Sequence, residues 1–184
     1  MPLSRKLRSR WVPKTRIGLM LQPRRIEPAS GQESVWDYPR PPRLERVTER
    51  LRVIFAALTI ADTRRGFRVL ETSHPPVFYI PPNDVQRAFL FEAPSSSLCE
   101  FKGIAKYWSL DVRGTRSERA AWSYPDPTQQ FAEIKDCLAF YASHVDECWV
   151  GEERVDAQQG DFYGGWITSR VSGPFKGAPG TSGW

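Results

Sequence analysis

Hydrophobic and polar residues alternate over short stretches of this chain, with the two-residue period that is typical of β-strands. Residues 67–71 show this alternation clearly. Residues 52–62 contain two β-rich runs around a small-residue centre, Ala56-Ala57, which predicts a strand, a tight turn and a second strand. Further short strands are predicted at residues 88–91, 99–112, 119–124, 138–141, 147–150, 152–155 and 167–171, and residues 99–124 are expected to form a hairpin.

Helical signals are few and short. Residues 128–135 form the best helical segment, with Thr128 as its cap, and Asn83-Asp84 can cap a single turn. Strands do not alternate with long helices, and neither GxGxxG nor GxxxxGK[ST] occurs, which argues against Rossmann and P-loop folds. The pattern therefore predicts a mostly β protein, a single domain of antiparallel sheets with one or two short helices.

The composition agrees with this picture and narrows the class of protein. The 184 residues include 7 Trp, 16 Pro and 13 Gly, which favours many short elements with stiff connections. No stretch approaches the roughly 20 apolar residues that a membrane-spanning helix needs, so no membrane partner is expected. The three cysteines form no CxxC pair, which argues against a disulfide framework and a cysteine zinc site. We expect a cytoplasmic protein without a metal or another cofactor.

The net charge of +5 is unevenly distributed. Residues 1–25 hold eight of the 26 basic residues and no acidic one, so the remainder carries 18 basic against 21 acidic residues. Such an arm can bind nucleic acid or serve as a targeting peptide, or it can simply be disordered. We expect a basic, disordered extension over residues 1–29, one β-rich domain over residues 30–180 and a loose C-terminus over residues 181–184, with Met20 as a second candidate start.

The segment ETSHPPVFYIPP, residues 71–82, is the first candidate for chemistry. It contains one of the two histidines, His74, three residues after Glu71, and the four prolines that follow in the segment forbid a central strand. A carboxylate that orients an imidazole would form a general base. The alternative is a stiff turn in which His74 bonds its own loop. Rigid loops on β scaffolds often carry functional groups.

A lysine within an apolar strand is the second candidate. In the predicted strand 99–112, a two-residue period places Lys102 and Trp108 on one face and Tyr107 on the other. Lys102 must lie at an edge, face a cleft or pair with an acid, and in a cleft it could hold a phosphate or a carboxylate. The alternative is a solvent-exposed lysine. Cys99 would be a nucleophile only if His74 lay beside it.

Aromatic residues are the third candidate, as a pocket for a flat ligand or a cation. Trp122 and Tyr124 are two apart on a predicted strand and so share a face, and Trp108, Tyr107 or Tyr79 could complete the wall. The alternative is ordinary core packing, because large aromatic residues dominate small β cores. Gly164-Gly165, between Tyr163 and Trp166, indicates a bulge or a close approach of the backbone.

Taken together, these motifs resemble the bacterial family known as domain of unknown function 427. The matching segments are ESVWDYPRPPR (33–43), VLETSHPPVFYIPP (69–82), CEFKGIAKYW (99–108), AAWSYPDP (120–127), LAFYASHVDECWV (138–150) and FYGGWITS (162–169). The resemblance implies a β-tent-like domain, a class shared with B-type methionine sulfoxide reductases and cereblon-like ligand-binding domains. Several of those relatives hold zinc with two cysteine pairs, which this chain lacks. The family also carries a nucleotidyltransferase-like label, but the carboxylate cluster that such chemistry needs is not evident here.

Three functional hypotheses follow from the sequence. The first is a small-molecule-binding domain whose pocket is lined by Glu71, His74, Tyr79, Lys102, Trp108, Trp122 and Tyr124. The second is an enzyme in which Glu71 and His74 act as acid and base and Lys102 anchors an anion. The third is nucleic-acid binding through the basic extension, against which the acidic domain argues.

Overall fold

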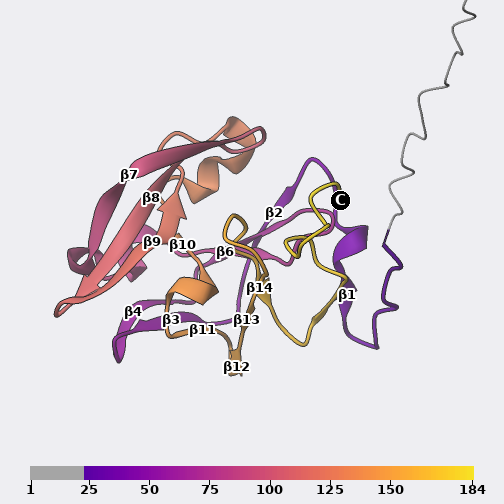
Figure 1. Ribbon diagram of the computed structural model, residues 1–184, viewed down its shortest axis with the longest axis horizontal. Coiled ribbons are helices and arrows are strands. Elements are labelled where there is room, and N and C mark those ends of the chain that lie inside the picture. The colour runs from indigo at the N-terminus through magenta and orange to yellow at the C-terminus, as the bar shows by residue number, and fades with distance from the viewer. Residues whose placement is uncertain (1–22) are drawn as a thin grey trace, which may run out of the picture.

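The computed structural model describes residues 23–184, and in this part of the chain short strands dominate (Figure 1). Two four-stranded sheets, one three-stranded sheet and two strand pairs are present among these residues. All pairings between named strands are antiparallel except that of β1 (Glu33–Ser34) with β15 (Val171–Ser172). The predicted fold class, a mostly β protein of antiparallel sheets, is confirmed.

The first four-stranded sheet has the order β12-β11-β3-β4. Its strands are β3 (Leu51–Phe55), β4 (Leu58–Thr63), β11 (Glu147–Val150) and β12 (Glu153–Arg154). Ala56 and Ala57 connect β3 to β4 with φ angles of 48° and 59°. Two consecutive positive φ values produce the tight turn whose twist matches a hairpin. The predicted strand–turn–strand over residues 52–62 is therefore confirmed.

The second four-stranded sheet has the order β10-β9-β8-β7. Its strands are β7 (Leu90–Cys99), β8 (Gly103–Val112), β9 (Thr115–Ser123) and β10 (Ala139–Phe140). The prediction of one strand over residues 99–112 is wrong, because Cys99 pairs with Gly103 and residues 100–102 form the turn between two strands. The expected strand at residues 88–91 was misplaced as well. β7 contains Pro94 and three serines, which hid it from the hydrophobic pattern, and its edge position tolerates a proline.

The three-stranded sheet has the order β2-β5-β6 and carries the proline-rich segment at its edge. Its strands are β2 (Arg43–Arg46), β5 (Phe67–Leu70) and β6 (Val77–Tyr79). The short pair β13 (Asp156–Ala157) and β14 (Trp166–Ile167) follows later in the chain. The predicted strand at residues 167–171 is divided between β14 and β15, with a turn between them.

The described helices are 3-10 helices. The expected helix at residues 128–135 is η4 (Gln129–Ile134), which is kinked at Phe131. Thr128 does not cap it, because the Thr128 hydroxyl donates a hydrogen bond to the Phe101 carbonyl at 2.6 Å. The remaining four are η1 (Val35–Asp37), η2 (Pro82–Asp84), η3 (Arg87–Phe89) and η5 (Ala142–His144), so residues 23–184 contain more short helices than expected.

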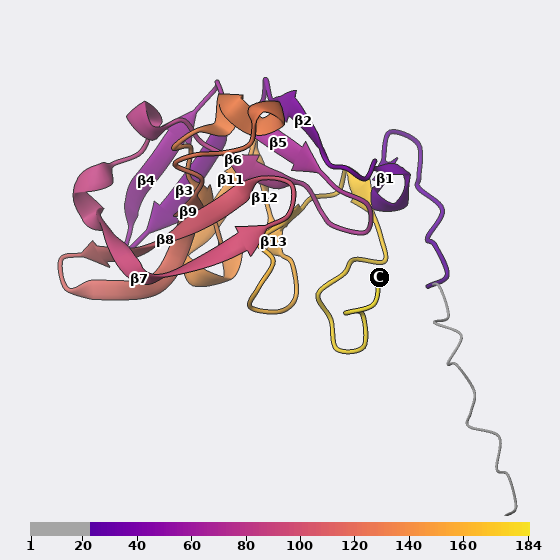
Figure 2. The ribbon, with the colours of Figure 1, turned by 90° about the horizontal axis from the view of Figure 1, so that it is seen from above.

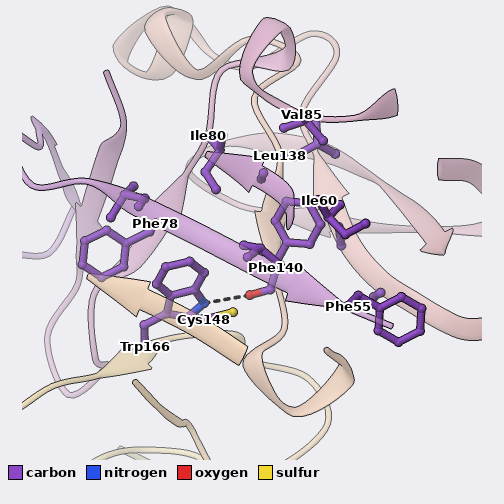
Figure 3. Close-up of a cluster of buried hydrophobic side chains, with 14 of the residues drawn as sticks. Phe55, Ile60, Phe78, Ile80, Val85, Leu138, Phe140, Cys148 and Trp166 are labelled. Atoms are coloured by element: carbon purple, nitrogen blue, oxygen red, sulfur yellow. Dashed lines mark hydrogen bonds between the residues drawn. The ribbon is translucent and has the colours of Figure 1, made fainter. Parts of the chain in front are cut away.

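Two hydrophobic clusters lie on opposite faces of the β7–β10 sheet. The first fills the space against the β3-β4-β11-β12 sheet, where Trp166 is fully buried and its indole N–H donates to the Phe140 carbonyl at 2.9 Å (Figure 3). The second lies against β5 and β6 and is rich in aromatic residues, including Tyr79, Tyr107 and Trp122. The three-stranded sheet thus covers the face on which the candidate site lies.

Both ends of the described chain lie on the side of the molecule that carries β1 (Figure 2). The Ile26 amide donates to Gly173 at 3.1 Å, so the chain is held to the domain before residue 30. At the other end, which we expected to be loose, the Trp184 ring meets Trp36 edge-on at 5.6 Å. Residues 1–22 lie outside the described part, and with them most of the basic arm on which the nucleic-acid hypothesis rests. No helix in the described part is long and apolar enough to cross a membrane.

Candidate functional site

A cavity of about 340 Å³ lies between β5–β6 and the face of the β7–β10 sheet that carries the aromatic cluster. Six of the seven residues that the sequence nominated line it, namely Glu71, His74, Tyr79, Lys102, Trp122 and Tyr124. Tyr107, which the sequence analysis offered as a further wall residue, also lines it. The remaining wall includes residues that the sequence did not nominate, among them Arg40, Phe101, Tyr141, Gln158, Phe162, Tyr163 and Lys176.

The loop after β5 forms one rim of this cavity, and backbone hydrogen bonds fix it on both sides. The Ser73 amide donates to Val35 at 2.9 Å, and the Ser73 carbonyl accepts from the Lys176 amide at 2.8 Å. The Thr72 hydroxyl donates to the Tyr38 carbonyl at 2.6 Å. Ser73 has a φ of 70°, an uncommon value that its bonded surroundings hold in place. The loop is therefore stiffened by tertiary contacts as well as by its prolines.

Glu71 points to an arginine rather than to the histidine. Its carboxylate lies 3.2 Å from Arg40 Nη1, and the same guanidinium binds Glu100 at 2.8 Å. The link between Glu71 and His74 that the structure records is a backbone hydrogen bond, from the His74 amide to the Glu71 carbonyl at 3.0 Å. The expected carboxylate–imidazole pair is thus replaced by an arginine bridge between two glutamates.

His74 is buried, with 6% of its surface exposed, and its proton can be assigned. Nδ1 lies 3.0 Å from the Thr72 carbonyl oxygen, which can only accept, so Nδ1 carries the hydrogen. Nε2 is buried without a hydrogen-bond partner in the described structure. Burial is the largest cause that lowers the pKa of His74 below 6.5, and nearby cations reinforce it, whereas the bond to Thr72 and the charge of Glu71 oppose it. The neutral imidazole therefore keeps a free lone pair at Nε2.

Lys102 lies in the turn between β7 and β8, not on a strand as expected, and is 8% exposed. Gly103 follows with a φ of 99°, which lets the chain reverse there. The Lys102 ammonium lies 6.0 Å from the ring centre of Tyr124 and 5.7 Å from that of Phe131. No carboxylate of residues 23–184 approaches it within 4.0 Å. Lys102 thus brings an unpaired positive charge to the cavity.

An aromatic wall occupies the sheet side of the cavity. Tyr107 and Trp122 are cross-strand partners on β8 and β9. The Trp122 ring centre lies 4.5 Å from that of Tyr141 and 6.4 Å from that of Tyr79. Burial raises the pKa of Tyr79, Tyr124 and Tyr141 well above the ordinary value, so these side chains remain neutral phenols. The wall offers flat ring faces and hydroxyl groups to a ligand.

Trp108 does not line the cavity, and our expectation for it needs correction. Trp108 pairs with Ala121 on the opposite face of the sheet and packs against the first hydrophobic cluster. Its indole N–H donates to the Ser123 hydroxyl at 2.9 Å, and the Arg87 guanidinium lies 5.1 Å from its ring centre. Consecutive residues of a strand point to opposite faces, so Tyr107 reaches the cavity in its place.

The second rim comes from the C-terminal part of the chain. Gln158 joins two segments of it, donating to the Lys176 carbonyl at 2.7 Å and accepting from the Gly165 amide at 2.9 Å. The Lys176 ammonium donates to the Trp184 carbonyl at 2.6 Å. A Cβ on Gly164 would lie 2.3 Å from the Trp122 ring. The Gly164-Gly165 pair was the signal in the sequence for this close approach.

Metal-binding and nucleophilic groups are sparse in the described structure. No group of three His, Cys, Asp or Glu side chains within residues 23–184 could hold a metal ion. Cys137 and Cys148 are buried free thiols, and burial raises the pKa of Cys137 to about 11 and that of Cys148 further. Cys99 is half-buried and lines the cavity, but no hydrogen bond joins it to His74.

The comparisons with known proteins concern the central part of this chain. Residues 43–151 match the family model described as a domain of unknown function (DUF427), which is labelled NTP_transf_9. No curated protein matches the chain. The matched segment runs from β2 to just after β11 and includes Glu71, His74, Lys102 and Trp122. Because this match covers more than half of the 184 residues, the chain belongs to the family of domains of unknown function 427.

Proposed function

We propose that the protein binds a small molecule in the cavity between β5–β6 and the β7–β10 sheet. Protein interiors are normally packed as densely as organic crystals, so an unfilled volume of about 340 Å³ next to the core needs a reason. Small-molecule sites occupy about 300–1,000 Å³ and combine aromatic walls with a few polar groups. The aromatic wall of Tyr79, Trp122 and Tyr141 and the buried Lys102 fit this description.

The observation that carries the proposal is the coexistence of apolar walls and unpaired polar groups in one cavity. A cavity that served only as a packing defect would be lined by apolar atoms. Here the Lys102 ammonium has no carboxylate partner within residues 23–184, and His74 Nε2 has no hydrogen-bond partner there. A ligand that fills the cavity would satisfy groups that the folded chain leaves open.

A thermal-shift screen of the full chain tests this proposal. A ligand at 100 times its dissociation constant adds about 2.7 kcal/mol to the free energy of unfolding, which raises the Tm by several degrees. We expect such a shift for at least one member of a panel of small ring compounds, and its loss in Trp122→Ala. Trp149→Ala is the matched control, because Trp149 on β11 does not line the cavity. A panel without any Trp122-dependent shift would contradict the proposal.

Catalysis in the same cavity is the second candidate, and the arrangement of His74 favours it. The Thr72 carbonyl fixes the proton on Nδ1 and leaves the lone pair of Nε2 unpartnered, which is the state that a general base needs. The base would be oriented by a carbonyl rather than by Glu71. If a ligand of the cavity is converted by the protein, His74→Asn should abolish turnover, whereas His144→Asn, outside the cavity, should not.

A further inference from the structure

Several charged groups of the cavity have partners within the described chain. Arg40 bridges Glu71 and Glu100, so both cavity carboxylates are already paired. The Lys176 ammonium donates to the Trp184 carbonyl. Of the basic nitrogen groups that line the cavity, the Lys102 ammonium has no carboxylate partner and His74 Nε2 has no hydrogen-bond partner within residues 23–184. The Lys102 ammonium can thus bind an anion, and His74 Nε2 can accept a hydrogen bond.

The lack of partners at Lys102 and His74 Nε2 is costly for the folded protein. The mostly buried Lys102 ammonium without an anion loses part of its hydration, and the buried Nε2 acceptor of His74 without a donor loses hydration that nothing replaces. The charged residues that line the cavity are three basic and two acidic ones, so an anion would also balance the local charge. A cationic ligand would meet an ammonium at Lys102 and no free carboxylate.

The aromatic part of the cavity wall and the volume of the cavity restrict the shape of the ligand. The aromatic side chains of Tyr79, Trp122 and Tyr141 line the cavity, and aromatic rings pack well against a planar ring. The volume of about 340 Å³ is near the lower end of the usual range of ligand sites. A compound with one ring or two fused rings fits this space better than a larger molecule.

We propose that the ligand is a planar ring compound that carries a carboxylate or a phosphate together with an N–H or O–H group. The anion binds the Lys102 ammonium, and the N–H or O–H group donates to His74 Nε2. This inference rests on the proposed small-molecule function and adds the chemical class of the ligand. It also predicts which functional group of the ligand meets which side chain.

A matched set of compounds tests the class with the full 184-residue chain. Indole-2-carboxylate and indole-3-carboxylate carry both groups, 1-methylindole-3-carboxylate lacks the donor, indole-3-carboxamide lacks the anion, and 3-(aminomethyl)indole replaces it with a cation. For single rings, 3-hydroxybenzoate and 3-hydroxyphenyl phosphate carry both groups, and their methyl ethers lack the donor. Binding is measured by calorimetry and by thermal shift. Whether carboxylates or phosphates bind more tightly identifies the anion.

Two pairs of variants test the contacts. Lys102→Met removes the ammonium, and Lys106→Met is its control, because Lys106 on β8 does not line the cavity and pairs with Glu92. His74→Asn removes Nε2, while its amide nitrogen can still donate to the Thr72 carbonyl as Nδ1 does. His144→Asn is the control for this change. Both test variants delete a group that is unpaired in the described fold, so we expect both to fold.

We expect compounds with both groups to bind at least about tenfold more tightly than their amide, amine or methylated counterparts, because hydrogen bonds to charged groups are the stronger ones. Lys102→Met should remove the preference for the anion, and His74→Asn the preference for the donor. The inference is overturned if neutral or cationic rings bind as tightly as the anions, with a shift that still depends on Trp122. The proposed function would then stand. If no compound gives a Trp122-dependent shift, both fail.

If Lys102→Met does not fold, the comparison of anion with amide on the unaltered protein still decides the question. The same holds for His74→Asn and the comparison of N–H with N-methyl compounds.

Discussion

The two faces of the β7–β10 sheet are formed by the same strands but differ in what they contact. On one face, Trp108, Ala121 and Phe140 belong to or pack against a filled hydrophobic cluster. On the other, Tyr107 and Trp122 look into a cavity with charged groups on its walls. Trp108 directly follows Tyr107 in the chain, and Ala121 directly precedes Trp122. The strand period alone therefore separates a stabilising surface from a candidate binding surface.

The two faces differ in the polar groups that they bury as well as in how completely they are filled. The filled face buries aliphatic side chains such as Leu110 and Val112, and its large indole, Trp166, has its N–H bonded to the Phe140 carbonyl (Figure 3). The cavity face buries phenols, the ammonium of Lys102 and the imidazole of His74. Stability should thus come mainly from the filled face, and binding from the cavity face.

Truncating one indole on each side is the strongest test of this comparison. Trp166→Ala removes a fully buried side chain and leaves the Phe140 carbonyl without its donor, so we expect a loss of about 3–5 kcal/mol in the free energy of unfolding. Trp122→Ala enlarges a space that is already open, and we expect a smaller loss together with the loss of ligand binding. Urea unfolding monitored by circular dichroism measures the loss in the free energy of unfolding for both variants. Equal losses would refute the division between the faces.

Gly164 offers a test of the cavity wall with a somewhat smaller effect. In Gly164→Ala the new methyl group would lie 2.3 Å from the Trp122 ring, so the indole must shift into the cavity. Overpacking of this kind costs about 1–3 kcal/mol, and binding should weaken with it.

The double variant Gly164→Ala, Trp122→Phe provides the control. Phenylalanine lacks the far edge of the indole that the methyl group would strike, so adding Gly164→Ala to Trp122→Phe should cost less than adding it to the unaltered protein. If the two costs are equal, the collision with Trp122 is not the cause.

The smallest expected effect is a dependence of stability on pH that belongs to the cavity face. The pKa of His74 is lowered from 6.5, chiefly by burial, so below pH 6.5 the unfolded chain binds a proton that the folded chain does not. The free energy of unfolding should then fall as the pH falls below 6.5, by at most about 1.4 kcal/mol per pH unit, until the folded pKa is reached. Urea titrations between pH 4.5 and 7.5 measure this slope. His74→Asn should reduce it, while His144→Asn retains it; equal slopes in the two variants would exclude His74 as the source.

Local features of the sequence were predicted well because their causes are local. The hairpin β3–β4 follows from two β-rich runs around Ala56-Ala57. Strand β11 coincides with the strand that the sequence predicts at residues 147–150. The mostly β class, the stiffness of the loop that carries His74 and the close approach at Gly164 could be inferred in the same way. Each depends on the period of a strand or on the steric properties of proline and glycine.

Other features depend on contacts that no local pattern encodes. The turn at Lys102 was missed because the polar, proline-containing strand β7 before it has no hydrophobic alternation, and without its partner strand the run 99–112 resembles one strand. Arg40 and Lys176 enter the cavity from segments far from His74 in the chain.

The sequence by itself determined the type of element, the stiff loop and the kinds of side chain that the site could use. It also established that Tyr107 and Trp108 lie on opposite faces, because side chains alternate along a strand. Only the tertiary structure decided which of these faces the first cluster fills and which one borders the cavity. The physical reason is that the period of a strand fixes which residues share a face, whereas the cover of each face comes from other segments of the chain.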